Sequence, residues 1–378
     1  MPQTILIVAG EASGDRLGGA LMAELKKTHP KLRFIGVGGE HMYDQGLQPV
    51  FPMTDLAVMG LVEVIPAIPR ILKRLGQLEA LAKKEKPALI ITIDSQDFSS
   101  RLAKRIRTLG IPHIQYVAPK VWAWRQGRAH KLRELYTHLL TILPFEQGFF
   151  QNYGMKTNYV GHPATTMLEP YIKARSEGQK PVLALLPGSR NAELKRHWPI
   201  FLQTYRNLRQ RQPNLSAVLA LPNRKTLEAC QAIAPWESTD LILPVFGEER
   251  FHHLATATAA LTKSGTNNLE LALLGIPAIV TYRMNALTYL IARLLVKVPY
   301  ISLPNLILHN TSRRVAYPEY IQGEANTAKL TEVMSLLLSG TAARDAQTKA
   351  LASLKTLMAT PKPPAQMAAE VVSKYLNK

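Results

Sequence analysis

The sequence predicts an α/β protein built from two doubly wound parallel sheets. Short apolar runs typical of buried strands alternate with longer segments of helical periodicity, which is the pattern of parallel sheets covered by helices. One polar, aperiodic segment interrupts this series, and a second series follows it. At 378 residues the chain also exceeds the usual size of a single domain and suits two.

These observations divide the chain into four parts. The N-terminal domain takes residues 1–167, and residues 168–180 form the linker. The second domain takes residues 181–340, and residues 341–378 form C-terminal helices. We expect the last of these helices to return to the N-terminal domain.

The composition restricts the class of protein. A single cysteine, Cys230, excludes an internal disulfide framework and fits a reducing compartment. The chain begins without the features of a signal peptide, and no apolar run approaches the roughly 20 residues that span a bilayer, so we expect a cytoplasmic protein. The net charge of +19 is compatible with nucleic acid, an anionic membrane or phosphorylated substrates, and does not choose among them. No Asp-x-Asp motif and no Cys/His cluster of ligand spacing occurs, so no metal and no cofactor is predicted.

Polar residues follow two predicted strands of the first domain. The strand at residues 5–8 leads into a glycine-bearing loop that carries Glu11 and Ser13, and Ser13 or Asp15 could cap the helix that follows. The strand at residues 87–93 leads to Asp94 and Asp97. Ligands bind at the carboxyl ends of such strands, where a carboxylate can act as a general base. Asp97 is closer to the next helix and is expected to cap it, which leaves Asp94 as the base.

The second domain opens with a strand that ends in Gly188, Ser189 and Arg190. Glycine frees the backbone, Arg can bind phosphate through two donors, and N–H groups at a helix start favour anions. This pattern is typical of a diphosphate site. The alternative is a tight turn with a solvated arginine.

A second loop of the same kind follows the strand at residues 259–262. Asn267 and Glu270 have the spacing of a capping box, which predicts a helix start there. The loop would provide another anion cradle, and Glu270 could accept hydrogen bonds from a ribose. The residues assigned to this cradle are Ser264, Gly265, Thr266, Asn267 and Glu270.

Residues 56–75 form a basic amphipathic stretch. Such a stretch can lie in a membrane interface, and the alternative is an ordinary core-facing helix, which the pattern alone favours. The residues assigned to the interface are Val62, Val64, Ile65, Ile68, Arg70, Leu72, Lys73 and Arg74.

Six motifs together resemble those of lipid-A-disaccharide synthases, over nearly the whole chain up to about residue 310. They are Val8-Ala-Gly-Glu-Ala-Ser-Gly-Asp15, Leu56-Ala-Val-Met-Gly-Leu-Val-Glu-Val64, Ile93-Asp-Ser-Gln-Asp-Phe98, Tyr116-Val-Ala-Pro-Lys-Val-Trp-Ala-Trp-Arg125, Leu185-Leu-Pro-Gly-Ser-Arg190 and Val298-Pro-Tyr-Ile-Ser-Leu-Pro-Asn-Leu306.

The resemblance implies a GT-B glycosyltransferase, in which two Rossmann-like domains face a cleft. The implied reaction moves a diacylglucosaminyl group from UDP-diacylglucosamine to diacylglucosamine 1-phosphate, with inversion and without a metal. The implied location is the cytoplasmic face of the inner membrane of a Gram-negative bacterium, where the protein is peripheral and has no nucleic-acid partner. Because acylated substrates must be reached in a membrane, the interfacial interpretation of residues 56–75 becomes the favoured one. A homodimer is one of the arrangements that the sequence leaves open.

In this interpretation Asp94 takes the proton from the acceptor hydroxyl, and Glu11 is the rival base. Ser13 and Asp97 are expected at the acceptor.

Two other classes of protein are alternatives. One is another UDP-sugar enzyme on the same scaffold, either a soluble hexosaminyltransferase or a UDP-N-acetylglucosamine 2-epimerase. The other is a non-enzymatic basic protein that binds RNA or membrane.

Overall fold

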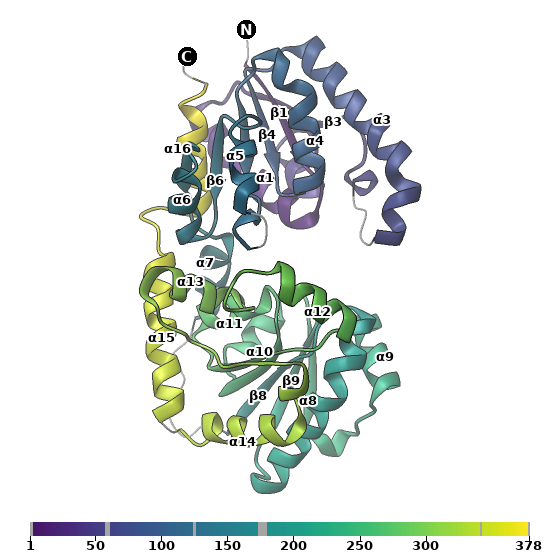
Figure 1. Ribbon diagram of the computed structural model, residues 1–378, viewed down its shortest axis with the longest axis vertical. Coiled ribbons are helices and arrows are strands. Elements are labelled where there is room, and N and C mark those ends of the chain that lie inside the picture. The colour runs from purple at the N-terminus through teal and green to yellow at the C-terminus, as the bar shows by residue number, and fades with distance from the viewer. Residues whose placement is uncertain (1–2, 57–60, 124–125, 173–179, 341, 377–378) are drawn as a thin grey trace. The chain divides into compact units, whose positions relative to one another are not determined.

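The computed structural model describes residues 3–56, 61–123, 126–172, 180–340 and 342–376 (Figure 1). The chain splits into two compact units, each described here by itself. Unit 1 comprises Met1–Pro163 together with Thr360–Lys378, and unit 2 comprises Ala164–Ala359. This division places the penultimate helix in unit 2 and the last helix in unit 1. The linker predicted at 168–180 lies partly outside the described residues, because 173–179 are not among them.

Unit 1 is organised around a seven-stranded parallel sheet with the strand order β3-β2-β1-β4-β5-β6-β7. The order reverses between β1 and β4, so the carboxyl ends of these two strands form the crevice in which doubly wound sheets bind ligands. The strands are β1 (Thr4–Ala9), β2 (Arg33–Val37), β3 (Leu47–Pro49), β4 (Leu89–Ile93), β5 (His113–Tyr116), β6 (His138–Thr141) and β7 (Thr157–Tyr159).

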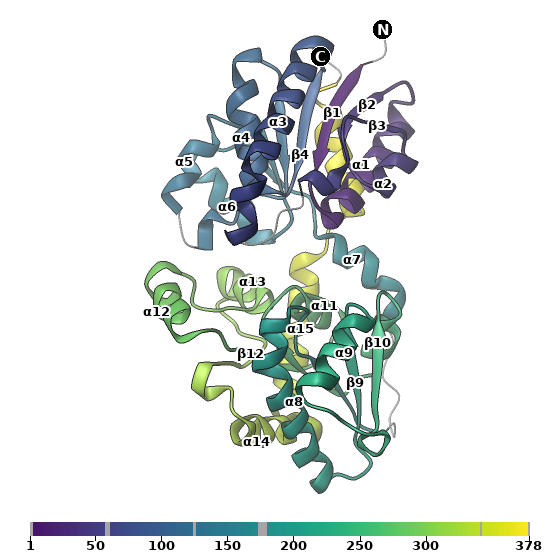
Figure 2. The same ribbon diagram turned by 90° about the vertical axis from the view of Figure 1, so that its right-hand side faces the viewer.

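Helices cover both faces of this sheet (Figure 2). One face packs against α1 and the last helix, α16, which contributes Ala368 and Val372 to the core. The other face packs against α3 and α4, through Leu78 and Leu102 among others. The helices are α1 (Ala12–Thr28), α2 (Glu40–Asp44), α3 (Leu61–Glu85), α4 (Gln96–Ile106), α5 (Ala129–Leu132), α6 (Pro144–Gln151) and α16 (Pro364–Ser373), with 3-10 turns η1 (Met53–Asp55), η2 (Arg107–Leu109), η3 (Val121–Ala123) and η4 (Gln126–Arg128).

Unit 2 repeats this plan with six parallel strands in the order β10-β9-β8-β11-β12-β13. Here the order reverses between β8 and β11. A core rich in large side chains, including Trp198 and Tyr205, fills one face of the sheet. The strands are β8 (Val182–Leu186), β9 (Ser216–Leu221), β10 (Ile242–Phe246), β11 (Ala259–Lys263), β12 (Ala278–Tyr282) and β13 (Glu319–Ile321).

Helices flank the sheet of unit 2, and two of them, α12 and α13, lie between β12 and β13 in the chain (Figures 1 and 2). The helices of this unit are α7 (Pro163–Leu168), α8 (Asn191–Arg211), α9 (Arg224–Ile233), α10 (Arg250–Leu254), α11 (Asn267–Leu274), α12 (Ala286–Leu295), α13 (Leu303–Ser312), α14 (Thr327–Leu338) and α15 (Ala342–Met358), with η5 (Glu169–Tyr171), η6 (Ser238–Asp240) and η7 (Gln322–Glu324). The predicted fold class is confirmed, since both sheets are parallel and doubly wound.

The expected capping of α1 by Ser13 or Asp15 is wrong. The helix begins at Ala12, with Glu11 as its N-cap residue. Asp15 is instead 4% exposed, and its carboxylate accepts hydrogen bonds from the N–H groups of Gly39 (2.7 Å), His41 (3.1 Å) and Met42 (3.1 Å). Asp15 therefore stabilises the start of α2, a partner that local spacing could not reveal.

Replacing Asp15 by Ala should lower the free energy of unfolding by about 2–3 kcal/mol, because three N–H groups around a buried carboxylate lose their acceptor. Asp44→Ala, at an exposed position of α2, is the matched control and should change stability by no more than about 0.5 kcal/mol. Urea unfolding followed by circular dichroism measures both, and equal midpoints for the two variants would contradict the capping role.

Candidate functional site

In unit 1, Glu11 and Asp94 follow neighbouring strands. Ala9 of β1 lies in register with Ile93 of β4, so the loops that leave these strands begin side by side. A Cβ atom at Gly10 would lie 2.4 Å from Ser95 Oγ, so a larger residue there would require the Ser95 side chain to move. The predicted base and its rival are thus brought to the same crevice.

The backbone around Asp94 is strained. Asp94 (φ 52°), Ser95 (φ 42°) and Val117 (φ 69°) all have left-handed conformations, which cost of order 1–3 kcal/mol each for residues with a side chain. Such strain persists where the surrounding structure over-determines the conformation, and it concentrates at functional sites.

Gln115 of β5 is the group that holds this backbone. Its side chain is 0% exposed, and Nε2 donates to the carbonyl oxygens of Asp94 (3.1 Å), Tyr116 (3.4 Å) and Val117 (3.2 Å). Ser99 Oγ donates to the Asp94 carbonyl as well, at 2.9 Å. The carbonyls that follow two adjacent strands are therefore fixed from inside the protein.

A buried chain of hydrogen bonds orients the Gln115 amide. Thr92 Oγ1 donates to Gln115 Oε1 at 2.5 Å and lies 2.8 Å from His113 Nε2. Since the threonine hydroxyl donates to the glutamine, the imidazole donates to the hydroxyl. Burial lowers the pKa of His113 to about 3, so the ring is neutral and can keep this tautomer.

The two carboxylates interact electrostatically. Burial and the nearby Asp94 charge raise the pKa of Glu11, and Lys120 opposes them. Lys120 also lies near Glu146, whose pKa burial raises to about 7 against hydrogen bonds from Trp122 Nε1 (3.0 Å) and the Leu143 N–H (3.1 Å). Lys120 therefore contributes to the electrostatic environment of both Glu11 and Glu146.

The expected capping role of Asp97 is wrong. Helix α4 begins at Gln96 with Ser95 as its N-cap, so Asp97 is an exposed residue of the first turn, where the helix dipole favours its charge. Ser13 is exposed in the first turn of α1. Both residues lie beside the loops that carry Glu11 and Asp94, and their assignment to the acceptor stays a prediction.

In unit 2, the loop after β8 closes around a carboxylate. Gly188 has φ 119°, and Glu193 Oε2 accepts hydrogen bonds from the N–H groups of Ser189 (3.2 Å) and Arg190 (3.4 Å). Lys263 Nζ lies 3.0 Å from Glu193 Oε1. Burial alone would raise the pKa of Glu193, but Lys263 and the two N–H groups together lower it below its ordinary value.

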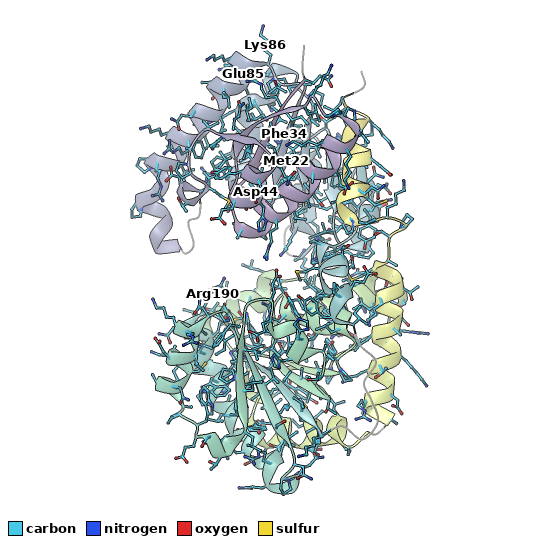
Figure 3. All side chains as sticks on the ribbon, turned by 180° about the vertical axis from the view of Figure 1, so that it is seen from behind. Met22, Phe34, Asp44, Glu85, Lys86 and Arg190 are labelled. Atoms are coloured by element: carbon cyan, nitrogen blue, oxygen red, sulfur yellow. The ribbon has the colours of Figure 1, made fainter. Side chains whose placement is uncertain are left out.

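Glu193 therefore occupies the two N–H groups that the sequence analysis assigned to a phosphate. The Arg190 side chain remains 73% exposed, with Nη1 3.5 Å from Glu193 Oε1, and it lies at the strand ends of its unit (Figure 3). The anion-binding group that this loop offers is thus the guanidinium. The assignment of Gly188, Ser189 and Arg190 to UDP stays a prediction.

The capping box predicted for Asn267 and Glu270 is wrong. Thr266 is the N-cap of α11, and the buried Asn268 accepts a hydrogen bond from the Gly265 N–H at 2.9 Å. Glu270 does not reach back to the helix start. Its two carboxylate oxygens each accept from Arg250 Nη2 at 3.1 Å, which fixes the side chain in place.

The other members of the second cradle lie where β11 passes into α11. Ser264 Oγ donates to the Ile301 carbonyl at 2.8 Å and is only partly exposed. Gly265 and Asn267 are also partly exposed, and Thr266 is exposed. A partly exposed helix start is compatible with an anion, and the UDP assignment of these residues stays a prediction.

Helix α3 divides into two parts. Leu75, Leu78 and Ala82 pack into the core, whereas Ile68 and Leu72 are each 43% exposed. Arg70 and Lys73 are exposed as well, and Arg74 is not, because Nε donates to Asp55 Oδ2 at 2.9 Å and the guanidinium stacks on Phe51. Three more interface residues were assigned near the start of α3. The structure does not describe the side chains of these residues, Val62, Val64 and Ile65.

No helix among the described residues is long and apolar enough to cross a membrane. In the same part of the chain, no group of three or more His, Cys, Asp or Glu side chains is arranged to hold a metal ion.

Two doubly wound parallel units, each with a polar loop at its switch point, define the GT-B class of nucleotide-sugar enzymes. The solved structures of this fold that resemble the chain include the glycotransferase of kitacinnamycin, with a TM-score of 0.66, 15% identity and coverage of 100% of both chains. Another is a putative UDP-N-acetylglucosamine 2-epimerase from Listeria monocytogenes, with a TM-score of 0.63, 12% identity and coverage of 100% of this chain and 98% of that one.

Sequence comparison identifies the family. The model of the lipid-A-disaccharide synthetase family matches residues 5–372. A lipid-A-disaccharide synthase of Anaeromyxobacter dehalogenans is 38% identical over 97% of this chain and 96% of that protein, and one of Pseudomonas putida KT2440 is 42% identical over 88% and 89%. The chain belongs to the lipid-A-disaccharide synthase family and is a glycosyltransferase of lipid A biosynthesis.

Sequence reasoning missed Gln115 and Glu193. Glu193 had a usable signal, since it stands three residues after Arg190, the position from which an acidic side chain binds the N–H groups of a helix start. Gln115 had a weaker one. It and His113 are polar residues on one face of an otherwise apolar strand.

Replacing Asp94 by Asn should lower the pKa of Glu11, because the Asp94 charge contributes to raising it. The pKa should stay above its ordinary value, since the effect of burial remains. Titration of the Glu11 carboxyl by carbon-13 NMR measures this. Asp97→Asn is the control and should leave the value unchanged, and an unchanged value in Asp94→Asn would show that the two carboxylates do not interact.

Replacing Gly188 by Ala should weaken UDP binding by about tenfold or more, because the new Cβ would lie 2.6 Å from Glu193 Oε2 on a backbone that L-residues rarely adopt. Gly247→Ala, also at positive φ (54°) but in open space, is the matched control. Isothermal titration calorimetry with UDP compares the two, and equal affinities would remove the β8 loop from the nucleotide site.

Proposed function

We propose that the chain transfers a 2,3-diacylglucosaminyl group from UDP-2,3-diacylglucosamine to the 6-hydroxyl of 2,3-diacylglucosamine 1-phosphate. The products are the β-1,6-linked disaccharide 1-phosphate and UDP. Family membership supports the reaction class. The observation that carries the proposal is the partly exposed Asp94, held at a strained strand end by Gln115 and Ser99.

The chemistry is a single displacement at the anomeric carbon of the donor. The bond from this carbon to the diphosphate oxygen breaks, and the bond to the acceptor O6 forms on the opposite face, which inverts the centre. The hydroxyl proton passes to the Asp94 carboxylate. A base must be held within hydrogen-bonding reach of one defined hydroxyl, and the backbone restraints on Asp94 support this role. Glu11 lies outside this set of restraints, and it would orient the acceptor.

The leaving UDP carries negative charge that the protein must offset. The exposed Arg190 guanidinium supports a role at the diphosphate, because Arg binds phosphate through two parallel donors. The accessible start of α11 adds backbone N–H groups. Glu270, already fixed by Arg250, would accept from the ribose hydroxyls with the lone pairs that remain.

Both substrates carry acyl chains, so the enzyme has to meet them at a membrane. The exposed Ile68 and Leu72 of α3, with Arg70 and Lys73 beside them, support peripheral binding to an anionic bilayer. We place the protein on the cytoplasmic face of the inner membrane of a Gram-negative bacterium. A homodimer remains compatible with this location.

Replacing Asp94 by Asn should lower kcat by about 10²–10⁴ and leave UDP affinity unchanged, because a general base contributes about that factor. Arg190→Ala should show the opposite pattern, with weaker UDP binding. The assay combines diacylated UDP-glucosamine with diacylglucosamine 1-phosphate and detects the disaccharide.

Two results would contradict the proposal. Full turnover by Asp94→Asn with loss of turnover by Glu11→Gln would transfer the role of base to Glu11. Turnover of water-soluble UDP-N-acetylglucosamine, with none of the acylated substrates, would instead indicate a soluble UDP-sugar enzyme on the same scaffold.

A further inference from the structure

Helix α12 exposes an apolar face to solvent. Leu287, Leu290, Ile291 and Leu294 recur at the spacing of one helix face, and Leu295 and Val296 continue it. These six side chains are between 44% and 78% exposed. They are six of the fourteen large apolar side chains that are exposed among the described residues, so the apolar surface is concentrated here.

The helix is not part of the core of its unit. None of its ten residues is buried, and only Tyr289 and Ala292, on the opposite side from the leucines, are partly covered. Figure 2 shows α12 at the margin of unit 2, outside the helices that flank the sheet. Exposed apolar surface of this kind marks a site that another phase or molecule covers.

The charged residues of the segment that carries α12 have a single sign. The chain has no acidic residue between Glu270 and Glu319, whereas five cationic residues occur in that interval. They are Arg283, Arg293, Lys297, Arg313 and Arg314.

A basic hollow adjoins the start of the helix. It has a volume of about 420 Å³ and is lined by Lys195 and Arg196 of α8, by Pro199 and Ile200, and by Arg283 and Met284, which directly precede the N-cap of α12. None of the residues assigned to UDP lines it. An anion-accepting hollow therefore lies next to the apolar helix.

We propose that α12 and this basic hollow form a second membrane-binding surface, which inserts the Leu287–Leu294 face among the acyl chains of an anionic bilayer and places lipid phosphates against Arg283, Lys195 and Arg196. An amphipathic helix with cations at its margins is the usual form of an interfacial anchor. A second copy of the chain fits less well, because a two-fold contact through α12 would bring the same cations face to face. The surface belongs to unit 2, whereas α3 belongs to unit 1, so the inference extends the proposed membrane location and is separable from the catalytic assignment.

The test measures binding of the full-length protein to vesicles made of phosphatidylethanolamine and phosphatidylglycerol, by co-sedimentation. Leu290→Ser combined with Leu294→Ser should weaken binding by at least about tenfold, because the exposed apolar area is lost. Leu241→Ser combined with Leu243→Ser, at two exposed leucines elsewhere in unit 2, is the matched control and should bind like the wild type. Thermal unfolding checks that every variant keeps its fold.

A charge variant and an α3 variant complete the design. Lys195→Gln combined with Arg196→Gln, at two exposed cations of the hollow, should weaken binding to these vesicles but leave the weaker binding to pure phosphatidylcholine unchanged. Ile68→Ser combined with Leu72→Ser tests α3 separately. Loss of binding in the α3 variant with none in the α12 variant would overturn this inference and leave the proposed membrane location intact.

Two further outcomes would also overturn it. If the α12 variant binds vesicles normally but changes its mass in analytical ultracentrifugation, α12 contacts a second copy. If it binds vesicles normally and only its KM for the acylated substrates rises, α12 contacts substrate acyl chains and not the bilayer.

Discussion

The buried amide of Gln115 is the interaction on which the geometry of unit 1 depends. Its two N–H donors serve carbonyls that follow β4 and β5, and these include the carbonyls of two residues in left-handed conformations. Without Gln115, the Asp94 carbonyl would keep the Ser99 hydroxyl but lose the amide, and losing a buried hydrogen bond costs about as much as the strain itself. The backbone position of Asp94 is therefore set in part by a side chain of the neighbouring strand.

In unit 2 a hydrogen-bond acceptor fixes the loop after β8, whereas in unit 1 a hydrogen-bond donor fixes the loop after β4. There Glu193, an acceptor, holds the N–H groups of the β8 loop, and Lys263 from the next strand neutralises it. His197 continues this network, since its Nδ1 donates to the Glu193 carbonyl and its Nε2 accepts from the Arg283 N–H. In both units a polar side chain from a neighbouring element immobilises the loop, so the backbone that carries the partly exposed Asp94 or the exposed Arg190 is fixed by the protein itself.

The fold was predictable because it depends on local pattern. Apolar runs marked the long strands, and their alternation with helices fixed the parallel sheets. Strands β3 and β13, each of three residues at a sheet edge, carried no such run and were not predicted. The surroundings of the candidate site residues were predictable only in part. The structure places Asp94 and Arg190 after the ends of predicted strands, but the partners of polar groups come from distant segments, as the 70-residue separation of Lys263 and Glu193 shows.

Two of the capping errors have the same cause. Asp15 and Glu270 both stand where local spacing allows a cap, and a side chain with a better partner elsewhere does not cap its own helix. Asp15 has three N–H groups of α2, and Glu270 has Arg250. Sequence spacing gives the set of local partners, and the tertiary structure decides between these and the distant ones.

The acylated substrates impose the last constraint. Extracting an acyl chain into water costs about 0.8 kcal/mol for each CH₂ group, so the reaction has to take place where the chains remain among lipids. In our proposal, α3 of unit 1 and α12 of unit 2 each contact this surface through about two to four apolar side chains beside cations. Where both helices reach the same bilayer, the second contact forms at the effective concentration set by the first, and binding is stronger than through either helix alone. The exposed leucines of α12 would then lie among acyl chains and not in water.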